Sequence, residues 1–178
     1  MKTYRRYSIS ALFEYNGATV LHYGFGAAGI IIGYNASLAV YIGGFVYFIF
    51  ALVQMYIIMP LIVCPNCVYY RMSDSLCTSG LNVVSKKIAR AGKVEDFSHR
   101  GEGILSHNNM YISALFVPIV AMIPALVINF SFTLLAIFLV VVGLLVLRMF
   151  IVFPKVACIH CSARRICPNA QSMGLSEK

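Results

Sequence analysis

The chain has 178 residues, of which 60% are hydrophobic and only 11% are charged, and its formal net charge is +8. Soluble domains carry about 25% charged residues. This composition therefore excludes a soluble globular enzyme, a disordered tail and a secreted disulfide scaffold, and it indicates a small integral membrane protein.

The charged residues are separated by two long uncharged stretches. No Asp, Glu, Lys or Arg occurs in the 56 residues between Glu14 and Arg71, or in the 45 residues between Glu102 and Arg148. A membrane-spanning helix needs roughly 20 apolar residues, so each stretch is long enough for two spans. Turns are expected at 33–37 and 129–131, where residues that favour chain reversal gather. We predict an all-α integral membrane protein with four transmembrane helices.

The basic residues predict the orientation of these spans. Three Lys and Arg precede the first span, six lie between residues 71 and 100, five lie from residue 148 onward, and the two turns have none. Lys and Arg are enriched on the cytoplasmic side of membrane proteins. Both termini and the central loop are therefore predicted to be cytoplasmic. The positive charge is explained by contact with anionic membrane lipids, so nucleic acid is not expected as a partner.

A repeat relates the two halves of the chain. Shifting the sequence by 94 residues aligns Pro60 with Pro154, Cys64 with Cys158, and Cys67 with Cys161. The same shift aligns Asn35 with Asn129, Ser37 with Ser131, Val46 with Val140, Met55 with Met149, and Ile57 with Ile151. Each unit contains two spans, so we expect parallel repeats related by an axis along the membrane normal. The two cytoplasmic Cys-rich knuckles would then lie at the same end.

The chain accordingly divides into five segments. Tyr4 and Tyr7, beside basic residues, predict an N-terminal segment that lies on the lipid headgroups. The segments are an interfacial N-terminus (1–17), the first repeat with its Cys pair (18–67), a cytoplasmic loop (68–110), the second repeat with its Cys pair (111–161), and a cytoplasmic tail (162–178).

The central loop contains a short basic amphipathic pattern. Leu81, Val84 and Ile88 recur at helical spacing among lysines, and Gly92 is expected to stop the helix. Such a helix is typical of one that lies on a membrane surface. It could alternatively dock an acidic soluble partner.

Several residues within the spans have structural interpretations. Gly29 and Gly33 form a GxxxG pair, which permits close approach of two helices. Pro118 and Pro124 are expected to bend the third span, with neighbouring groups satisfying the freed carbonyls. Arg148, close to the end of the last span, is expected to extend its side chain to the cytoplasmic headgroups.

The six cysteines indicate a metal centre. Cys64 and Cys67 form one Cys-x2-Cys pair, Cys158 and Cys161 form the other, and each half adds a third cysteine, Cys77 or Cys167. Two such pairs complete a tetrahedral sulfur site for zinc or iron. Six thiolates exceed what one ion uses, and Cys167 precedes proline as in ferredoxin-type runs. We therefore expect an iron–sulfur cluster, with zinc as the alternative.

Three histidines extend the possible ligand set. His22 and His107 are predicted close to cytoplasmic helix ends, where a pair of axial histidines could bind haem b. A hydrogen-bonded histidine at a helix end is the simpler alternative. His160 lies inside the second Cys pair, where it could support the ligands from outside, and its counterpart in the first pair is Asn66.

We expect a non-catalytic electron-transfer or anchor subunit of a larger membrane complex. Such a subunit would carry electrons between a soluble partner and a quinone or haem. Two alternatives remain: a membrane scaffold with a structural zinc site, and a membrane thiol oxidoreductase or metal carrier that uses its Cys pairs as exchanging thiols.

Overall fold

The computed structural model describes residues 3–35, 37–103 and 106–175, so the ends of both terminal segments, residue 36 of the first turn and residues 104–105 of the central loop lie outside it. The described secondary structure is helical apart from two isolated β-bridges. In chain order the elements are α1 (Ile9–Gly33), α2 (Leu38–Val53), η1 (Gln54–Val63), η2 (Cys64–Asn66), α3 (Val68–Arg71), α4 (Leu81–Ile88), η3 (Glu95–Gly101), α5 (His107–Ile128), α6 (Phe132–Leu147), η4 (Arg148–Cys158), η5 (Arg164–Ile166) and α7 (Pro168–Ser172).

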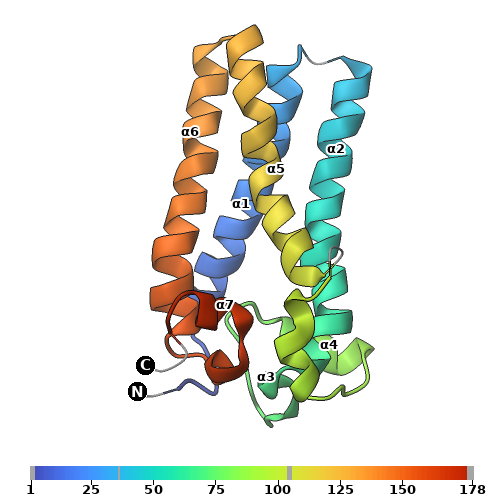
Figure 1. Ribbon diagram of the computed structural model, residues 1–178, viewed down its shortest axis with the longest axis vertical. Helices are drawn as coiled ribbons and strands as arrows, with labels where there is room; N and C mark the ends of the chain where they lie inside the picture. The colour runs from blue at the N-terminus through green and yellow to red at the C-terminus, as the bar shows by residue number, and fades with distance from the viewer. Residues whose placement is uncertain (1–2, 36, 104–105, 176–178) are drawn as a thin grey trace.

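The long helices α1, α2, α5 and α6 run side by side along the long axis of the molecule (Figure 1). The short helices gather at one end of this bundle, together with both ends of the described chain. We call this end the cap; it comprises residues 3–8, 64–103 and 158–175. The bundle and cap confirm the predicted all-helical class.

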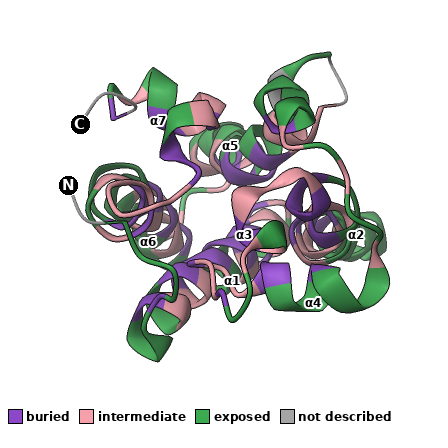
Figure 2. Ribbon diagram, turned by 90° about the horizontal axis from the view of Figure 1, so that it is seen from below, coloured by how far each residue is buried: buried purple, intermediate pink, exposed green. Residues whose placement is uncertain are grey.

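Within the described residues, three continuous helices are long and apolar enough to cross a membrane: Leu38–Asn66, His107–Ile128 and Phe132–Cys158. This supports the expected membrane protein. Helix α1 is long enough but less apolar, and it carries the buried polar residues Thr19 and His22. It packs against α2, α5 and α6, and Figure 2 shows buried residues on the sides of the helices that face one another.

Glycines allow α1 to lie close to α5. A Cβ atom added to Gly26 would come within 2.8 Å of Pro118, and one added to Gly33 would come within 2.7 Å of Ala125. Gly29, between them, lies against Met122 in the same way. The close approach that the GxxxG pair predicts is therefore present, and α5 is the partner helix.

Helix α5 continues through both of its prolines. Pro118 has no N–H, so the carbonyl of Ala114 lacks its usual helical donor. The hydroxyl of Tyr47 on α2 donates to this carbonyl over 2.8 Å, and Nε2 of His22 lies 3.0 Å from the next carbonyl, that of Leu115. The prediction that neighbouring groups satisfy the carbonyls freed by proline is confirmed at this site.

The second and fourth long helices correspond in detail. Helices α2 and α6 begin and end 94 residues apart, which is the offset of the sequence match. Each passes directly into a π-helical segment, η1 or η4, that contains a proline, Pro60 or Pro154. Wide π-helical turns are unusual and often lie at functional sites, and both of these lead into a Cys pair.

The N-terminal segment differs from the expectation. Helix α1 begins at Ile9, with the Ser8 hydroxyl accepting from the Ala11 N–H, so it includes the second half of the segment 1–17. Tyr7 is buried, so its prediction as a headgroup residue is wrong. Residues 3–8, which we call the strap, run between two parts of the cap: the Tyr4 N–H donates to the carbonyl of His160, and the Tyr7 N–H to that of Leu76.

The predicted helix in the central loop is present as α4. It ends at Ile88, four residues before Gly92, so Gly92 does not stop it. Its buried side consists of Leu81, Asn82 and Ser85, whereas Val84 and Ile88 are exposed. Gly92 instead lies against the first Cys pair, where a Cβ atom would overlap the Asn66 amide.

Candidate functional site

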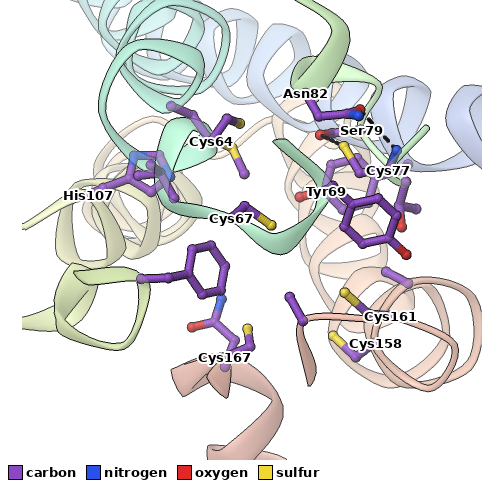
Figure 3. A pocket seen from close by; sticks show the side chains of 18 of the residues that line it. Cys64, Cys67, Tyr69, Cys77, Ser79, Asn82, His107, Cys158, Cys161 and Cys167 are labelled. Carbon is purple, nitrogen blue, oxygen red and sulfur yellow. Dashed lines mark hydrogen bonds between the residues drawn. The ribbon is translucent and has the colours of Figure 1, made fainter. Parts of the chain in front are cut away.

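All six cysteines line one cavity of about 140 Å³ between the bundle and the cap. A single water molecule needs about 10–15 Å³ of such space, so the cavity has room for a much larger group. Figure 3 shows Cys64 at the upper left and Cys67 near the centre of the view, Cys158 and Cys161 at the lower right, and Cys167 at the lower left. The structure thus brings together the sulfur-bearing residues of both halves of the chain.

The two Cys pairs have the same backbone turn. We call residues 64–67 the first knuckle and residues 158–161 the second. In the first, the Cys67 N–H donates to the carbonyl of Cys64 over 3.0 Å; in the second, the Cys161 N–H donates to that of Cys158 over 3.1 Å. Each turn follows a π-helical segment, and it brings two cysteines separated by two residues to the same cavity.

Polar contacts fix the remaining two cysteines. The Cys77 N–H donates to the side-chain oxygen of Asn82 over 3.0 Å, and its Sγ lies 3.4 Å from the Ser79 hydroxyl (Figure 3). Asn82 also donates to the carbonyl of Ser75. Cys167 is buried and precedes α7, with its carbonyl accepting from an amide in that helix.

Two tyrosines join the strap to the cavity. The Tyr7 hydroxyl donates to the carbonyl of Ala157 over 2.5 Å, and the Tyr69 hydroxyl donates to that of Tyr4 over 2.6 Å. Burial raises the pKa of Tyr69 to about 12, so its hydroxyl remains a protonated donor at neutral pH. Tyr69 also lines the cavity, and the strap therefore supports the cavity wall directly.

The structure separates the two histidines considered for haem. His107 lines the cavity and its ring stacks on Tyr111 with centroids 6.3 Å apart. His22 is outside the described cavity lining and pairs with the carbonyl of Leu115. Leu115 lies eight residues beyond His107 on α5, an axial rise of about 12 Å at 1.5 Å per residue. His22 therefore behaves as a hydrogen-bonded core histidine.

His160 also lies outside the described lining of the cavity. Its ring stacks on Tyr4, with centroids 4.2 Å apart and planes inclined by 20°. Its backbone carbonyl accepts a hydrogen bond from the N–H of Tyr4, which belongs to the strap. His160 thus holds the strap against the second knuckle.

The cysteines surround the cavity without converging on one point. Within the described part of the chain, no three His, Cys, Asp or Glu side chains are placed together so as to hold a metal ion. A centre that uses these thiols would draw them inward, by rotation about the Cα–Cβ bond that staggered cysteine rotamers allow.

Arg148 is not where the sequence predicts it. The side chain is only 1% exposed, so the expected extension to the headgroups is wrong. Its guanidinium lies 5.2 Å from the ring centroid of Tyr15, 5.1 Å from that of Tyr111, and 5.3 Å from that of Phe153. These rings come from α1, α5 and η4 and enclose the cation. All three also line the cysteine cavity.

Sequence reasoning missed several residues of the cavity wall. Tyr69, Asn82 and Phe97 line it, although none belongs to a metal-binding pattern. The one available signal was a polar residue, Asn82, within the periodic segment of α4. Tyr69 and Phe97 carry no local signal, because their roles depend on contacts with distant parts of the chain.

Comparison with protein-family models, with curated proteins and with solved structures finds no match to this chain. The chemistry and geometry of the cavity are therefore the evidence that bears on function.

Proposed function

We propose that the protein is a membrane-bound electron-transfer subunit that holds an iron–sulfur centre through its cysteines. The observation that carries the proposal is the gathering of all six cysteines, from both halves of the chain, around one cavity. In this proposal Cys64, Cys67, Cys158 and Cys161 are the main ligands. Cys77 and Cys167 complete or tune the centre.

The number of thiols around the cavity favours a cluster over a single ion. Zinc in a structural site is bound by four ligands, with Zn–S bonds of about 2.3 Å. Six thiols in the wall of one cavity suit a group of several metal atoms better. Iron–sulfur clusters are such groups, and cysteine thiolates are their usual ligands.

We also propose the finer architecture that accompanies this function. Four helices span the membrane, with α1 as the central, less apolar span, and the two hairpins form parallel tandem repeats. The matching bounds of α2 and α6 and the matching knuckles support the repeat. The cap is assigned to the cytoplasm from the distribution of basic residues.

The position of the cavity suggests the path of the electrons. A soluble donor would reduce the centre at the cap, and a quinone or a haem-containing partner in the membrane would reoxidise it. A surface for an acidic donor is offered by three exposed basic residues at the end of α4 and just beyond it: Lys87, Arg90 and Lys93. The exposed Val84 and Ile88 suit contact with lipid at the same surface.

Anaerobic purification in detergent, followed by absorption spectroscopy and analysis of iron, acid-labile sulfide and zinc, tests this function. Brown protein with iron and sulfide is expected. Colourless protein with stoichiometric zinc would contradict it and favour the scaffold. Protein without metal, whose thiols cycle with thioredoxin, would favour a thiol oxidoreductase.

Single substitutions test whether both knuckles serve one centre. Cys64→Ser and Cys158→Ser should each remove the iron, because each deletes a ligand from a different half. Ser98→Ala, at an exposed position of the cap, is the control and should retain it. If only one of the two cysteine variants lost iron, the shared centre would be wrong.

Chemical labelling tests the orientation. A cysteine introduced at Asn129, in the turn between α5 and α6, should react in intact cells with a membrane-impermeant maleimide. One introduced at Ser98 in the cap should react only after the cells are opened. The reverse pattern would contradict a cytoplasmic cap.

A further inference from the structure

Arg148 is a buried cation whose guanidinium makes no hydrogen bond of good geometry with a described residue, although the Tyr15 side chain lies close enough to interact with it. Its Nε, Nη1 and Nη2 atoms are all buried and none has a hydrogen-bond partner there. Its surroundings are the three aromatic rings described above, which attract a cation through their faces. Rings do not replace the hydrogen bonds that five guanidinium N–H groups make in water.

No carboxylate in the described chain balances this charge. Its acidic residues are all exposed: Glu14, Asp74, Glu95, Asp96 and Glu102. Burying a charge without a partner is strongly unfavourable, and an arginine cannot escape this by losing its proton. A permanent positive charge at this depth therefore calls for a negative charge inside the protein.

The cysteine cavity is the place where such a charge would form. Tyr15, Tyr111 and Phe153 touch both the guanidinium and the cavity, so a single layer of rings separates the cation from the space between the thiols. Four thiolates outnumber the positive charge of a divalent ion. A metal centre with such ligands is consequently anionic, whether it contains zinc or iron and sulfide.

We infer that Arg148 is the buried counter-charge of an anionic metal–thiolate centre in the cysteine cavity. This inference rests on the proposed function and deepens it by fixing the sign of the charge that the cavity holds. Arg148 acts across the rings and does not ligate the metal, so it is a positioning residue. It favours the thiolate form of the site and, in a redox centre, the more negative reduced state.

The first half of the chain supplies an internal comparison. Gln54 lies 94 residues before Arg148, also at the start of a π-helical segment, and it is also fully buried. It is neutral and donates to the Tyr23 hydroxyl over 3.0 Å. A glutamine at this position is therefore compatible with the helix, and Arg148→Gln removes the charge while giving the second half the residue of the first.

The test compares wild-type protein with Arg148→Gln, Arg148→Lys and, as a neutral control at the equivalent position, Gln54→Leu. Each protein is loaded with iron and sulfide, or with zinc alone. Metal retention is measured by competition with a chelator, the redox midpoint by titration, and the melting temperature with and without the metal.

Arg148→Gln is expected to weaken metal retention at least about tenfold, whereas Arg148→Lys and Gln54→Leu retain it. The reduction equilibrium should shift about tenfold toward the oxidised centre, which is 59 mV for one electron. The melting temperature should fall in the loaded protein but rise in the metal-free protein, because the substitution removes an unbalanced buried charge.

Two results separate this inference from the proposed function. If wild-type protein binds metal and Arg148→Gln has the same metal retention and redox midpoint, Arg148 is not the counter-charge, while the proposed metal centre stands. Equal loss of melting temperature in both forms also overturns it, because Arg148 would then serve only to pack the rings. Wild-type protein that binds neither iron nor zinc overturns both.

Discussion

The hydroxyl of Tyr47 donates a 2.8 Å hydrogen bond to the carbonyl of Ala114, the group that loses its helical donor because Pro118 follows four residues later. A side chain of α2 thus completes the backbone of α5. The contact ties α2 to α5.

Removing this hydroxyl should destabilise the bundle. We expect Tyr47→Phe to lower the free energy of unfolding by about 1 kcal/mol, because a buried carbonyl loses its donor. Tyr41→Phe, at a residue that is 51% exposed on the same helix, should change it little. Unfolding in mixed detergent micelles measures both.

A double substitution shows whether proline is the reason for this bond. Pro118→Ala restores the N–H that an α-helix offers to Ala114, so Tyr47→Phe should cost less in that background. Equal costs in the two backgrounds would mean that the hydroxyl does not compensate for the proline.

The close contact between α1 and α5 predicts opposite effects on stability for alanine substitutions at two neighbouring glycines. Gly26→Ala would place a methyl group 2.8 Å from Pro118, and such overpacking costs about 1–3 kcal/mol. Gly24→Ala meets nothing within 4 Å and should stabilise the helix by up to about 1 kcal/mol. Thermal unfolding of the two variants measures the difference. A shift of the melting temperature in the same direction in both would contradict the close contact of α1 with α5 at Gly26.

Gly92 is expected to fix the position of the first knuckle. Its N–H donates to the carbonyl of Pro65, and a Cβ there would overlap the side chain of Asn66. We expect Gly92→Ala to displace the turn that presents Cys64 and Cys67 and to lower metal retention by the proposed centre several-fold. Asn66→Ala removes the overlapping amide, so the double variant should recover retention. No recovery would show that the clash is not the cause.

The His99–Glu102 pair predicts a pH-dependent contact in the cap. Nδ1 of His99 lies 2.6 Å from Oε1 of Glu102, and this hydrogen bond raises the pKa of His99 above its ordinary value of about 6.5. The contact is therefore fully formed below that ordinary value and is lost as the pH rises through the raised pKa. An NMR titration measures it.

Two substitutions serve as the comparison for this titration. Glu102→Gln should return the pKa of His99 toward its ordinary value. Glu95→Gln, at another exposed acid in η3, should leave it raised. An unchanged pKa in Glu102→Gln would rule out the pair.

Features written as local patterns could be predicted from the sequence. Charge-free stretches predicted the long helices, the residues at 33–37 and 129–131 predicted the turns, and Gly29 with Gly33 predicted a close helix pair. The sequence match at an offset of 94 residues predicted that both Cys pairs lie at one end, because a unit with an even number of spans would leave the membrane on the side it entered.

Features that depend on tertiary packing could not be predicted from the sequence. From the sequence, a single arginine near a helix end is expected to reach water or lipid headgroups. Arg148 is instead buried, and its burial requires Tyr15 and Tyr111 from two other helices. Tyr7 among basic residues looks interfacial, yet its hydroxyl reaches Ala157, 150 residues away. The contact of Gly92 with Asn66 spans 26 positions of the chain and leaves no local signal.

The spread of the cavity residues along the chain also sets an order in time. The strap at residues 3–8 is made before the rest of the cavity wall, but its hydrogen-bond partners include His160 and Ala157. The cavity is lined by cysteines from position 64 to position 167, so its wall is incomplete until the second hairpin has left the ribosome. A centre that uses both knuckles can consequently be loaded only after the second knuckle has been made.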